Sequence, residues 1–208
     1  GDVYKRQGDH CLGLAGVIQR ISLDVVPHEV HVHYPASGEE YFQRLRRASI
    51  FQDRSRLVPQ PFTEPGVLFA TDQYVLSTDE LDHTVPTYGF RIQETDSRRL
   101  DRAALRAAGL SGPLVGQLVR EGSVDVDGRT VRLADVSQPR PGQAFAIVMD
   151  TRPCDGARRL AQGADLLLCE STYLQSEQTE AGERGHMTAS QAAQLAAESS
   201  VRRLVLTH

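Results

Sequence analysis

The apolar positions near the start of the chain follow the period of a helix. Four of them are spaced i, i+3, i+4 and i+7 and predict a helix that begins just after His10 and buries one face, at Leu14, Val17, Ile18 and Ile21. Residues 30–34 alternate apolar and polar side chains and predict a strand. A Pro-Ala-Ser-Gly turn then leads into a charged segment that predicts a helix to about Phe51.

The middle of the chain contains two stretches that differ in composition and in the elements they predict. Residues 51–90 are rich in β-branched and aromatic residues and contain four prolines, which predicts short strands joined by loops. Residues 96–135 predict a charged helix over 97–108, then a Gly-Leu-Ser-Gly-Pro segment, then a hairpin whose turn is Asp127-Gly128. We expect this second stretch to project from the body of the protein.

Three apolar runs in the second half of the chain each lead to a side chain that could bind a metal ion or transfer a proton. Residues 144–149 predict a buried strand that leads to Asp150, and 166–169 predict a second that leads to Glu170. Residues 201–207 predict a last strand that leads to His208. Thr188 followed by Gln191 matches a capping box and predicts a helix start. The alternation of strands and helices indicates an α/β fold.

Size and composition fit one globular domain and exclude several classes of protein. The 208 residues are 40% hydrophobic and 24% charged, which excludes a disordered tail. Lys and Arg total 23 against 27 Asp and Glu, so binding to nucleic acid would need a local basic patch. The chain shows neither a run of about 18 apolar residues nor a signal-peptide pattern, and we expect no membrane partner. The three cysteines are scattered, so we expect a cytoplasmic protein without disulfides.

Carboxylates and imidazoles gather at the predicted strand ends, at the first helix and in two loops. The candidates are Asp9, His10, His83, Asp150, Glu170, His186 and His208. Such ligands suit zinc, and two ions that share a carboxylate can promote attack of water on phosphorus or a carbonyl. Each residue also has an ordinary interpretation, because an Asp-His pair at a helix start is usually a cap and an Asp after a strand usually belongs to a turn. Only the coincidence of several ligands favours a metal site.

Two further features carry less weight. The pair His31 and His33 would point to one face of a strand, which is metal-binding geometry, but no carboxylate lies close to it in that strand. We therefore interpret the pair as a solvated or loosely packed face. Cys169, beside Glu170, is interpreted as a small core residue.

Three segments resemble motifs of the metallo-β-lactamase superfamily. Residues 8–16, Gly-Asp-His-Cys-Leu-Gly-Leu-Ala-Gly, resemble the second half of the His-x-His-x-Asp-His motif and the helix after it. Residues 150–154, Asp-Thr-Arg-Pro-Cys, resemble the strand-end motif whose aspartate bridges two metals. Residues 206–208, Leu-Thr-His, resemble the start of the last ligand motif.

Four other segments resemble parts of one family, and three of them, at 81–92, 109–114 and 186–189, narrow the resemblance to it. Residues 81–92 resemble a segment that carries a zinc-ligating histidine, and residues 109–114 resemble the tip of an arm that grips RNA. Residues 170–172 and 186–189, Glu-Ser-Thr and His-Met-Thr-Ala, resemble a Glu and His pair beside the scissile phosphate. The chain from residue 8 to 208 resembles ribonuclease Z, the tRNA 3′-processing endonuclease of this superfamily.

The resemblance implies a fold and a substrate. It implies the metallo-β-lactamase αββα sandwich, incomplete at the N-terminus, with an inserted tRNA-binding arm over 96–135 whose tip includes Gly109, Gly112 and Pro113. Residues 95–135 hold seven arginines and six acidic residues, so the net charge of this stretch is only +1. A basic grip on tRNA must then come from the arrangement of the arginines. The resemblance also implies a homodimer that presents the arm of one subunit to tRNA at the site of the other.

The resemblance further implies a division of roles. His83 and Asp150 would help to hold one zinc ion, and the second would be held by Asp9, His10, Asp150 and His208. Asp9 would also act as general base for attack on the phosphorus that follows the discriminator base of precursor tRNA. His186, oriented by Glu170, would donate a proton to the departing oxygen.

Two positions depart from the family's pattern. The two histidines expected four and two residues before Asp9 are Lys5 and Gln7 here, and neither is a credible zinc ligand at neutral pH. The strands that precede this motif in the family are also absent. We therefore expect residues 1–7 to be foreign sequence, such as a cloning scar, and residues 8–208 to be a partial metallo-β-lactamase domain truncated at both ends.

Three functions remain open at this point. The first is a zinc-dependent endonuclease that removes 3′ trailers from precursor tRNA. The second is another metallo-β-lactamase-fold phosphodiesterase or a sulfatase that acts on a small ester. The third is a non-catalytic RNA-binding fragment.

The departure at Lys5 and Gln7 generates a prediction about the 208-residue chain itself. We expect it to cleave precursor tRNA far more slowly than an intact member of the family, because one metal would lack two ligands. The measurement is a cleavage time course with a 3′-labelled precursor tRNA. A rate comparable with that of an intact homologue would contradict the expected truncation.

Overall fold

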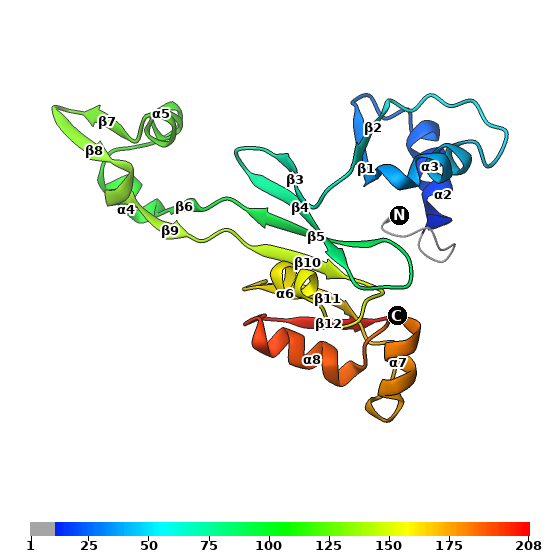
Figure 1. Ribbon diagram of the computed structural model, residues 1–208. Helices are drawn as coiled ribbons and strands as arrows, with labels where there is room; N and C mark the ends of the chain where they lie inside the picture. The colour runs from blue at the N-terminus through cyan, green and yellow to red at the C-terminus, as the bar shows by residue number, and fades with distance from the viewer. Residues whose placement is uncertain (1–10) are drawn as a thin grey trace. The chain divides into compact units, whose positions relative to one another are not determined.

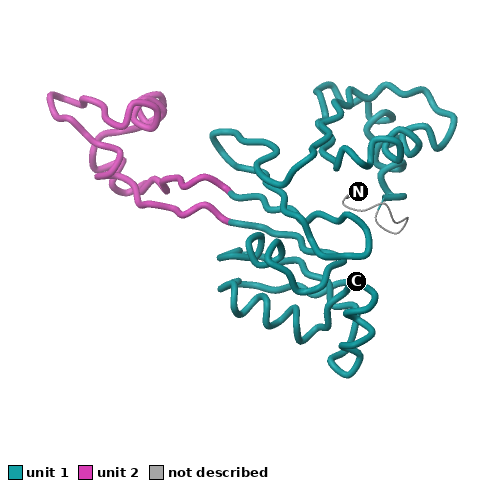
Figure 2. The backbone as a smooth tube through the Cα atoms, viewed as in Figure 1, with its two compact units in different colours: residues 1–93, 144–208 teal, residues 94–143 magenta. Residues whose placement is uncertain are grey.

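The computed structural model describes residues 11–208 and divides them into two compact units, which Figure 2 shows in different colours. The first unit combines the residues up to 93 with residues 144–208, and the second comprises residues 94–143. The chain therefore leaves the first unit once and returns to it. The second unit contains the whole 96–135 stretch singled out in the sequence.

A six-stranded mixed sheet forms the centre of the first unit (Figure 1). Its order is β12-β11-β10-β5-β4-β3, in which β10, β11 and β12 run parallel and β5 pairs antiparallel with β10. The strands are β3 (Gly66–Ala70), β4 (Tyr74–Leu81), β5 (Thr87–Glu94), β10 (Ala144–Val148), β11 (Leu166–Glu170) and β12 (Leu204–Thr207). The short strands predicted over 51–90 and the three apolar strands of the second half are confirmed.

Two helices pack against this sheet. Helix α6 (Asp155–Ala161) contacts β4 and β10, and α8 (Ala189–Glu198) contacts β11 and β12 (Figure 1). Their apolar faces meet buried strand residues, Cys169 among them, which confirms that cysteine as a core residue. Burial raises the pKa of the Cys169 thiol to about 12, and the nearby Glu170 charge adds to the effect, so the thiol stays protonated. A short helix η3 (Gln175–Glu177) and α7 (Gln178–Arg184) connect β11 to α8.

The start of the first unit has its own apolar cluster. It consists of α2 (Gly13–Leu23), β1 (Val30–Pro35), η1 (Ala36–Gly38), α3 (Glu39–Arg46) and β2 (Leu57–Phe62), with β1 and β2 parallel. The rings of Tyr34 and Phe42 stack with centroids 4.6 Å apart in its centre. The predicted first helix and first strand are confirmed, but Val17, expected on the buried face of the helix, is exposed, and Ser22 is buried instead.

The second helix ends earlier than the sequence pattern predicts. Helix α3 stops at Arg46 instead of continuing to about Phe51. Phe42 and Leu45 pack into the cluster, but one further turn would place Ser49 there, and Ser49 instead accepts a hydrogen bond from Gln19. Because Ser49 brings no apolar side chain to this face, another helical turn would gain no burial there. Phe51 packs against the cluster from beyond the helix end.

The second unit is a small α/β body with its own core, formed by Leu105, Leu110, Leu118, Val124 and Val136. Its elements are β6 (Ser97–Leu100), α4 (Arg102–Ala107), α5 (Pro113–Glu121), β7 (Ser123–Val126), β8 (Arg129–Arg132), η2 (Leu133–Val136) and β9 (Ser137–Arg140). The predicted hairpin is confirmed, with Asp127 and Gly128 at φ 50° and 76° between β7 and β8.

The helix predicted over 97–108 is wrong in its first third. Residues 97–100 form β6, which pairs antiparallel with β9, and α4 starts only at Arg102. Asp101 caps α4, because its carboxylate accepts hydrogen bonds from the N–H groups of Ala103 and Ala104. A partner strand some 40 residues later in the sequence therefore overrides the local pattern.

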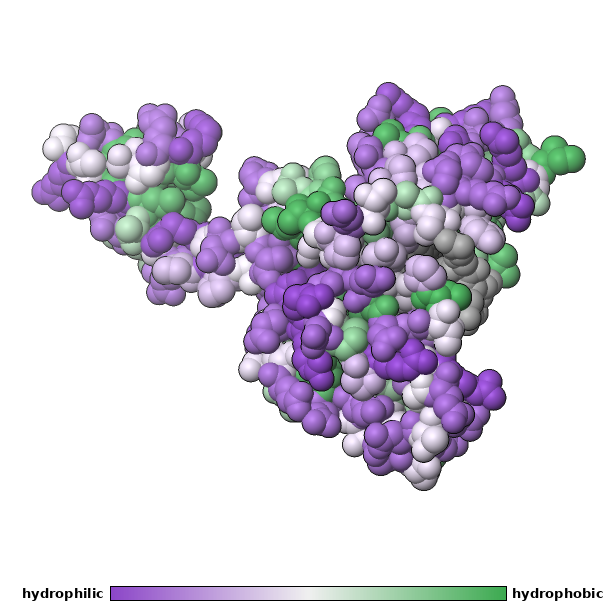
Figure 3. All heavy atoms as spheres, in the orientation of Figure 1, coloured by the Kyte–Doolittle hydropathy of each residue, from purple (hydrophilic) through white to green (hydrophobic). Residues whose placement is uncertain are grey.

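The visible surface of both units is mostly hydrophilic, with apolar side chains in small separate groups (Figure 3). Among residues 11–208, no helix has the length and apolar character needed to span a lipid bilayer.

Gly156 generates a prediction about stability, because it lets α6 approach β4 closely. A Cβ added at Gly156 would lie 1.9 Å from the carbonyl oxygen of Glu80, which no rotamer change can relieve. We expect Gly156→Ala to lower the free energy of unfolding by about 2 kcal/mol or more, measured by urea denaturation. Gly182→Ala in α7 is the matched control, since nothing lies within 4 Å of its added Cβ. This control should raise stability by about 0.5–1 kcal/mol, and equal effects of the two substitutions would contradict the close approach.

Candidate active site

The candidate site lies where three neighbouring parallel strands end. Asp150 follows β10 by two residues, Glu170 is the last residue of β11, and His208 follows β12 directly. Because β10, β11 and β12 are parallel and adjacent, their carboxyl ends meet at the same edge of the sheet. His186 comes from the loop between α7 and α8 and joins these residues.

Asp150 has an unusual backbone conformation. It is fully buried and has a φ of 51°, in the left-handed region that few residues other than glycine adopt. Aspartate is among the residues that tolerate this region, yet the conformation still costs free energy. The chain thus turns sharply at the end of β10 and holds a buried carboxylate at the sheet edge.

The Glu170 carboxylate is fully buried and accepts hydrogen bonds from four donors. These are the N–H of Thr151, the hydroxyl of Thr172 at 2.8 Å, Nδ1 of His186 at 3.1 Å and the N–H of Met187 at 3.2 Å. Burial by itself raises the pKa of this carboxyl. The hydrogen bonds from His186, Thr151 and Thr172 outweigh burial and bring the pKa below its ordinary value, so Glu170 is an anion.

His186 is oriented by this buried anion. Its Nδ1 lies 3.1 Å from both oxygens of Glu170 and 3.7 Å from Oδ1 of Asp150. A carboxylate can only accept, so the proton of this hydrogen bond resides on Nδ1. Gly185, at φ 83°, turns the chain just before this residue, and the His186 N–H donates to the carbonyl of Ala181. The ring is therefore held from both its backbone and its side chain.

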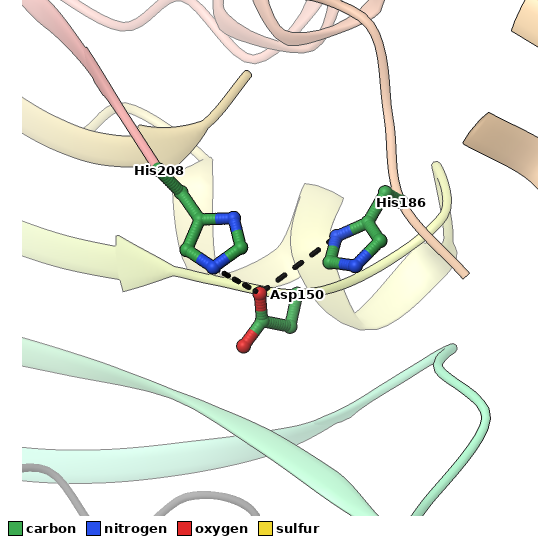
Figure 4. A group of neighbouring side chains, drawn as sticks. All are labelled: Asp150, His186 and His208. Atoms are coloured by element: carbon green, nitrogen blue, oxygen red, sulfur yellow. Dashed lines mark ion pairs between the residues drawn. The ribbon is translucent and has the colours of Figure 1, made fainter. Parts of the chain in front are cut away.

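His208 completes the group drawn in Figure 4. Its Nε2 lies 3.4 Å from Oδ1 of Asp150, and its Nδ1 lies 2.9 Å from the hydroxyl of Thr172. The two imidazoles approach Asp150 from different segments, and their ring centroids are 5.5 Å apart (Figure 4).

His83 lies beside His186 and comes from the loop after β4. Their ring centroids are 4.9 Å apart, and Nδ1 of His83 lies 2.7 Å from the carbonyl oxygen of Gly185. Since a carbonyl only accepts, Nδ1 of His83 carries a proton, which leaves Nε2 as the atom with a lone pair when the ring is neutral.

Arg152 connects the loops of this site, and it is not among the residues predicted from the sequence. Its backbone N–H donates to the Asp82 carbonyl at 2.8 Å, and its guanidinium pairs with the Asp82 carboxylate at 3.0 Å. Its Nε also donates to the carbonyl of Gly182 in α7 at 2.5 Å. The segments that carry His83 and His186 are thereby attached to the loop that follows Asp150.

The donor set suits a metal ion. Asp150, His186 and His208 each offer one ligand atom, and these atoms lie within 4.8 Å of one another. The Asp150–His208 separation of 3.4 Å is close to that of two ligands on a tetrahedral ion with bonds of about 2.1 Å. Nδ1 of His186 is directed at Glu170, whereas Oδ1 of Asp150 and Nε2 of His208 face each other, so this last pair could hold an ion. Imidazole with carboxylate is a donor set that fits zinc.

The structure therefore brings together four of the predicted residues, Asp150, Glu170, His186 and His208, with His83 beside them. Asp9 and His10 lie outside the described residues. Gly109, Gly112 and Pro113 belong to the second unit, and φ values of 71° and 54° at the two glycines explain the need for glycine there. The predicted set omitted Thr172, whose only sequence signal is its place two residues after Glu170. The pair His31 and His33 has ring contacts with Phe69 and belongs to no group of three ligands within residues 11–208.

Proteins of known name are similar to this chain in sequence. Residues 128–208 match the model of the β-lactamase superfamily domain. The chain is 54% identical over 201 residues to "Ribonuclease Z" of Salinispora arenicola, and 41% identical over 201 residues to that of Chlamydia trachomatis. Each match covers 97% of this chain. The chain is thus similar to ribonuclease Z over almost all of its own length.

The matches extend over only part of the family's length. The chain spans 65% of the Salinispora arenicola protein and 66% of the Chlamydia trachomatis protein.

Solved structures give the fold independently. Human tRNase Z, short form, superposes with a TM-score of 0.68 at 21% identity and covers 99% of this chain and 70% of its own. A metallo-β-lactamase fold protein from Bacillus subtilis superposes with a TM-score of 0.61 at 16% identity, over 99% of this chain and 61% of its own. The chain thus has the α/β metallo-β-lactamase fold predicted from its motifs.

The four hydrogen bonds to Glu170 generate a prediction about stability. In Glu170→Gln only one side-chain oxygen remains to accept, and the new amide N–H₂ group faces donors. We expect the free energy of unfolding to fall by about 2–3 kcal/mol, measured by urea denaturation at neutral pH. Glu183→Gln is the matched control, since Glu183 is exposed on α7 and its change should be within about 0.5 kcal/mol. Equal stability of the two variants would show that Glu170 does not organise the site.

Proposed function

We propose that this chain carries the catalytic site of a zinc-dependent endonuclease that removes 3′ trailers from precursor tRNA. One observation supports the proposal: Oδ1 of Asp150 and Nε2 of His208, which could hold an ion, lie beside His186, whose Nδ1 proton is directed at Glu170. Hydrolysis of a phosphodiester needs both parts, since negative charge builds on the phosphoryl oxygens while the departing oxygen needs a proton. The family's name supports RNA as the substrate.

The described residues divide these tasks. Asp150 and His208 would hold zinc, with His83 contributing to a second ion that shares Asp150. Zinc supplies Lewis acidity toward the phosphodiester when it is bound. With Nδ1–H held by the Glu170 anion, His186 in its doubly protonated form would donate the proton on Nε2 to the oxygen that leaves, and Glu170 keeps the ring oriented. Asp9 and His10 would complete the ion site, with Asp9 as general base.

The second unit supplies the grip on tRNA in this proposal. Residues 94–143 form a body with its own core and a glycine- and proline-containing tip at Gly109, Gly112 and Pro113. The arginines of this unit would bind the tRNA backbone, so that the substrate is chosen by shape. The proposal includes a homodimer, in which the arm of one subunit serves the site of the other. It also places the enzyme in the cytoplasm, where it would meet its substrate.

The alternatives are less well supported. A phosphodiesterase or sulfatase for small esters would share the Asp150 and His208 motifs, but it would have no use for the second unit. A non-catalytic RNA-binding fragment would not need a buried anion that orients an imidazole. Burying the Glu170 carboxylate costs free energy unless it is fully hydrogen-bonded, and RNA binding alone gives no reason to keep such a group.

A chimera tests the proposal. Residues 8–208 replace the matched region of the Salinispora arenicola protein, which supplies the remaining third of the family's length. We expect the chimera to bind two zinc ions per chain and to release the 3′ trailer from precursor tRNA. His186→Ala should lower kcat about 100- to 10,000-fold with zinc content unchanged, because it removes the proton donor and not an ion ligand. Glu183→Gln serves as the control variant.

Three outcomes would contradict the proposal. A chimera without zinc favours the non-catalytic alternative. A chimera that hydrolyses a small phosphodiester equally well after deletion of residues 96–135, and never cleaves tRNA, favours the small-ester enzyme. Loss of zinc in His186→Ala would make His186 an ion ligand and refute the division of roles.

A further inference from the structure

Thr172 occupies a position between the two halves of the site. Its hydroxyl oxygen lies 2.8 Å from Oε2 of Glu170 and 2.9 Å from Nδ1 of His208. Thr172 thus connects Glu170, which orients His186, to His208, which faces Asp150. Nδ1 of His186 lies farther from the same hydroxyl, at 3.4 Å, and is directed to Glu170 at 3.1 Å.

The sheet holds Thr172 and His208 next to each other although 36 residues separate them. Strand β11 pairs in parallel with β12, and Glu170 is in register with Thr207. One further hydrogen bond, from the N–H of Ser171 to the carbonyl of Thr207 at 2.9 Å, extends the ladder beyond the strand end. The contact between the two side chains is therefore set by backbone pairing and not by a flexible loop.

The Thr172 hydroxyl has a single proton, and this fixes which atom donates in its hydrogen bonds to Glu170 and to His208. A threonine hydroxyl has one proton to donate, and the buried Glu170 carboxylate can only accept it. The same hydroxyl therefore has only lone pairs to offer to His208. The proton in the bond to His208 must reside on Nδ1, which makes the ring the donor.

We propose that Thr172 is a positioning residue that holds His208 in the Nδ1–H form and thereby presents the Nε2 lone pair toward Asp150. The inference rests on the proposed function in one respect only, that an ion binds between Nε2 and Asp150. A lone pair on Nε2 and a carboxylate oxygen 3.4 Å away repel each other in the absence of a cation, so the arrangement favours one. A second residue that fixes the tautomer of a ligand histidine commonly raises metal affinity.

The first measurement determines the tautomer of His208 without metal. Ring ¹⁵N spectra of the 208-residue chain are recorded at about pH 8.5, two units above the usual histidine pKa of about 6.5, where neutral rings dominate. His208→Gln identifies the resonances. We expect Nδ1 to be protonated and Nε2 to be unprotonated in the unmodified chain. Thr172→Val should shift the ring toward the Nε2–H form, because valine has the shape of threonine without the hydroxyl.

The second measurement determines the affinity for zinc by competition with a chromophoric chelator. Thr172→Val should weaken the zinc Kd about 10- to 100-fold, and Thr172→Ser, which keeps the hydroxyl, should restore it to within about threefold of the unmodified chain. Thr207→Val is the matched control, since it removes the neighbouring hydroxyl, which takes part in neither bond of the His208–Thr172–Glu170 chain. Circular dichroism establishes that each variant is folded.

The outcomes separate this inference from the proposed function. An Nε2–H form of His208 in the unmodified chain overturns the inference, and this result does not require any variant to fold. Equal zinc affinity and an unchanged tautomer in Thr172→Val overturn it as well. Absence of zinc binding in the unmodified chain counts against the ion site of the proposed function, while the tautomer of the metal-free ring still decides the role of Thr172.

Discussion

The buried carboxylate of Glu170 is the interaction on which the rest of the site depends. A fully buried anion is tolerable only when its oxygens are occupied by donors, and here four donors from three separate segments supply them. Those segments follow β10, follow β11 and precede α8. Satisfying one charge therefore positions the loop of Asp150, the hydroxyl of Thr172 and the ring of His186 relative to one another.

Backbone pairing and Arg152 make the same arrangement rigid. The parallel ladder of β10, β11 and β12 sets the positions at which Asp150, Glu170 and His208 leave the sheet. Arg152 then joins the His83 loop to α7 through Asp82 and Gly182. The polar side chains at the end of this parallel sheet thus hold one another in place, and a site with defined proton positions requires this.

Local patterns predicted well those elements that bury their own apolar face. The period of Leu14 and Ile18 predicted α2, and the Asp127-Gly128 pair predicted the β7–β8 hairpin. They failed where a distant partner or a missing contact decided the structure. Residues 97–100 read as helix but pair with β9, and α3 ends at Arg46 because Ser49 has no apolar side chain to bury.

The sequence by itself determined the identity of the chemical groups and their places at strand ends, because apolar runs that end in Asp150, Glu170 and His208 are visible in one dimension. Only the tertiary structure decided which atoms face one another. It placed Nδ1 of His186 on Glu170, Nδ1 of His208 on Thr172 and Nε2 of His208 toward Asp150. The direction of a hydrogen bond depends on every other bond that its two partners make, and partners such as Thr172 and His208 lie 36 residues apart in the chain.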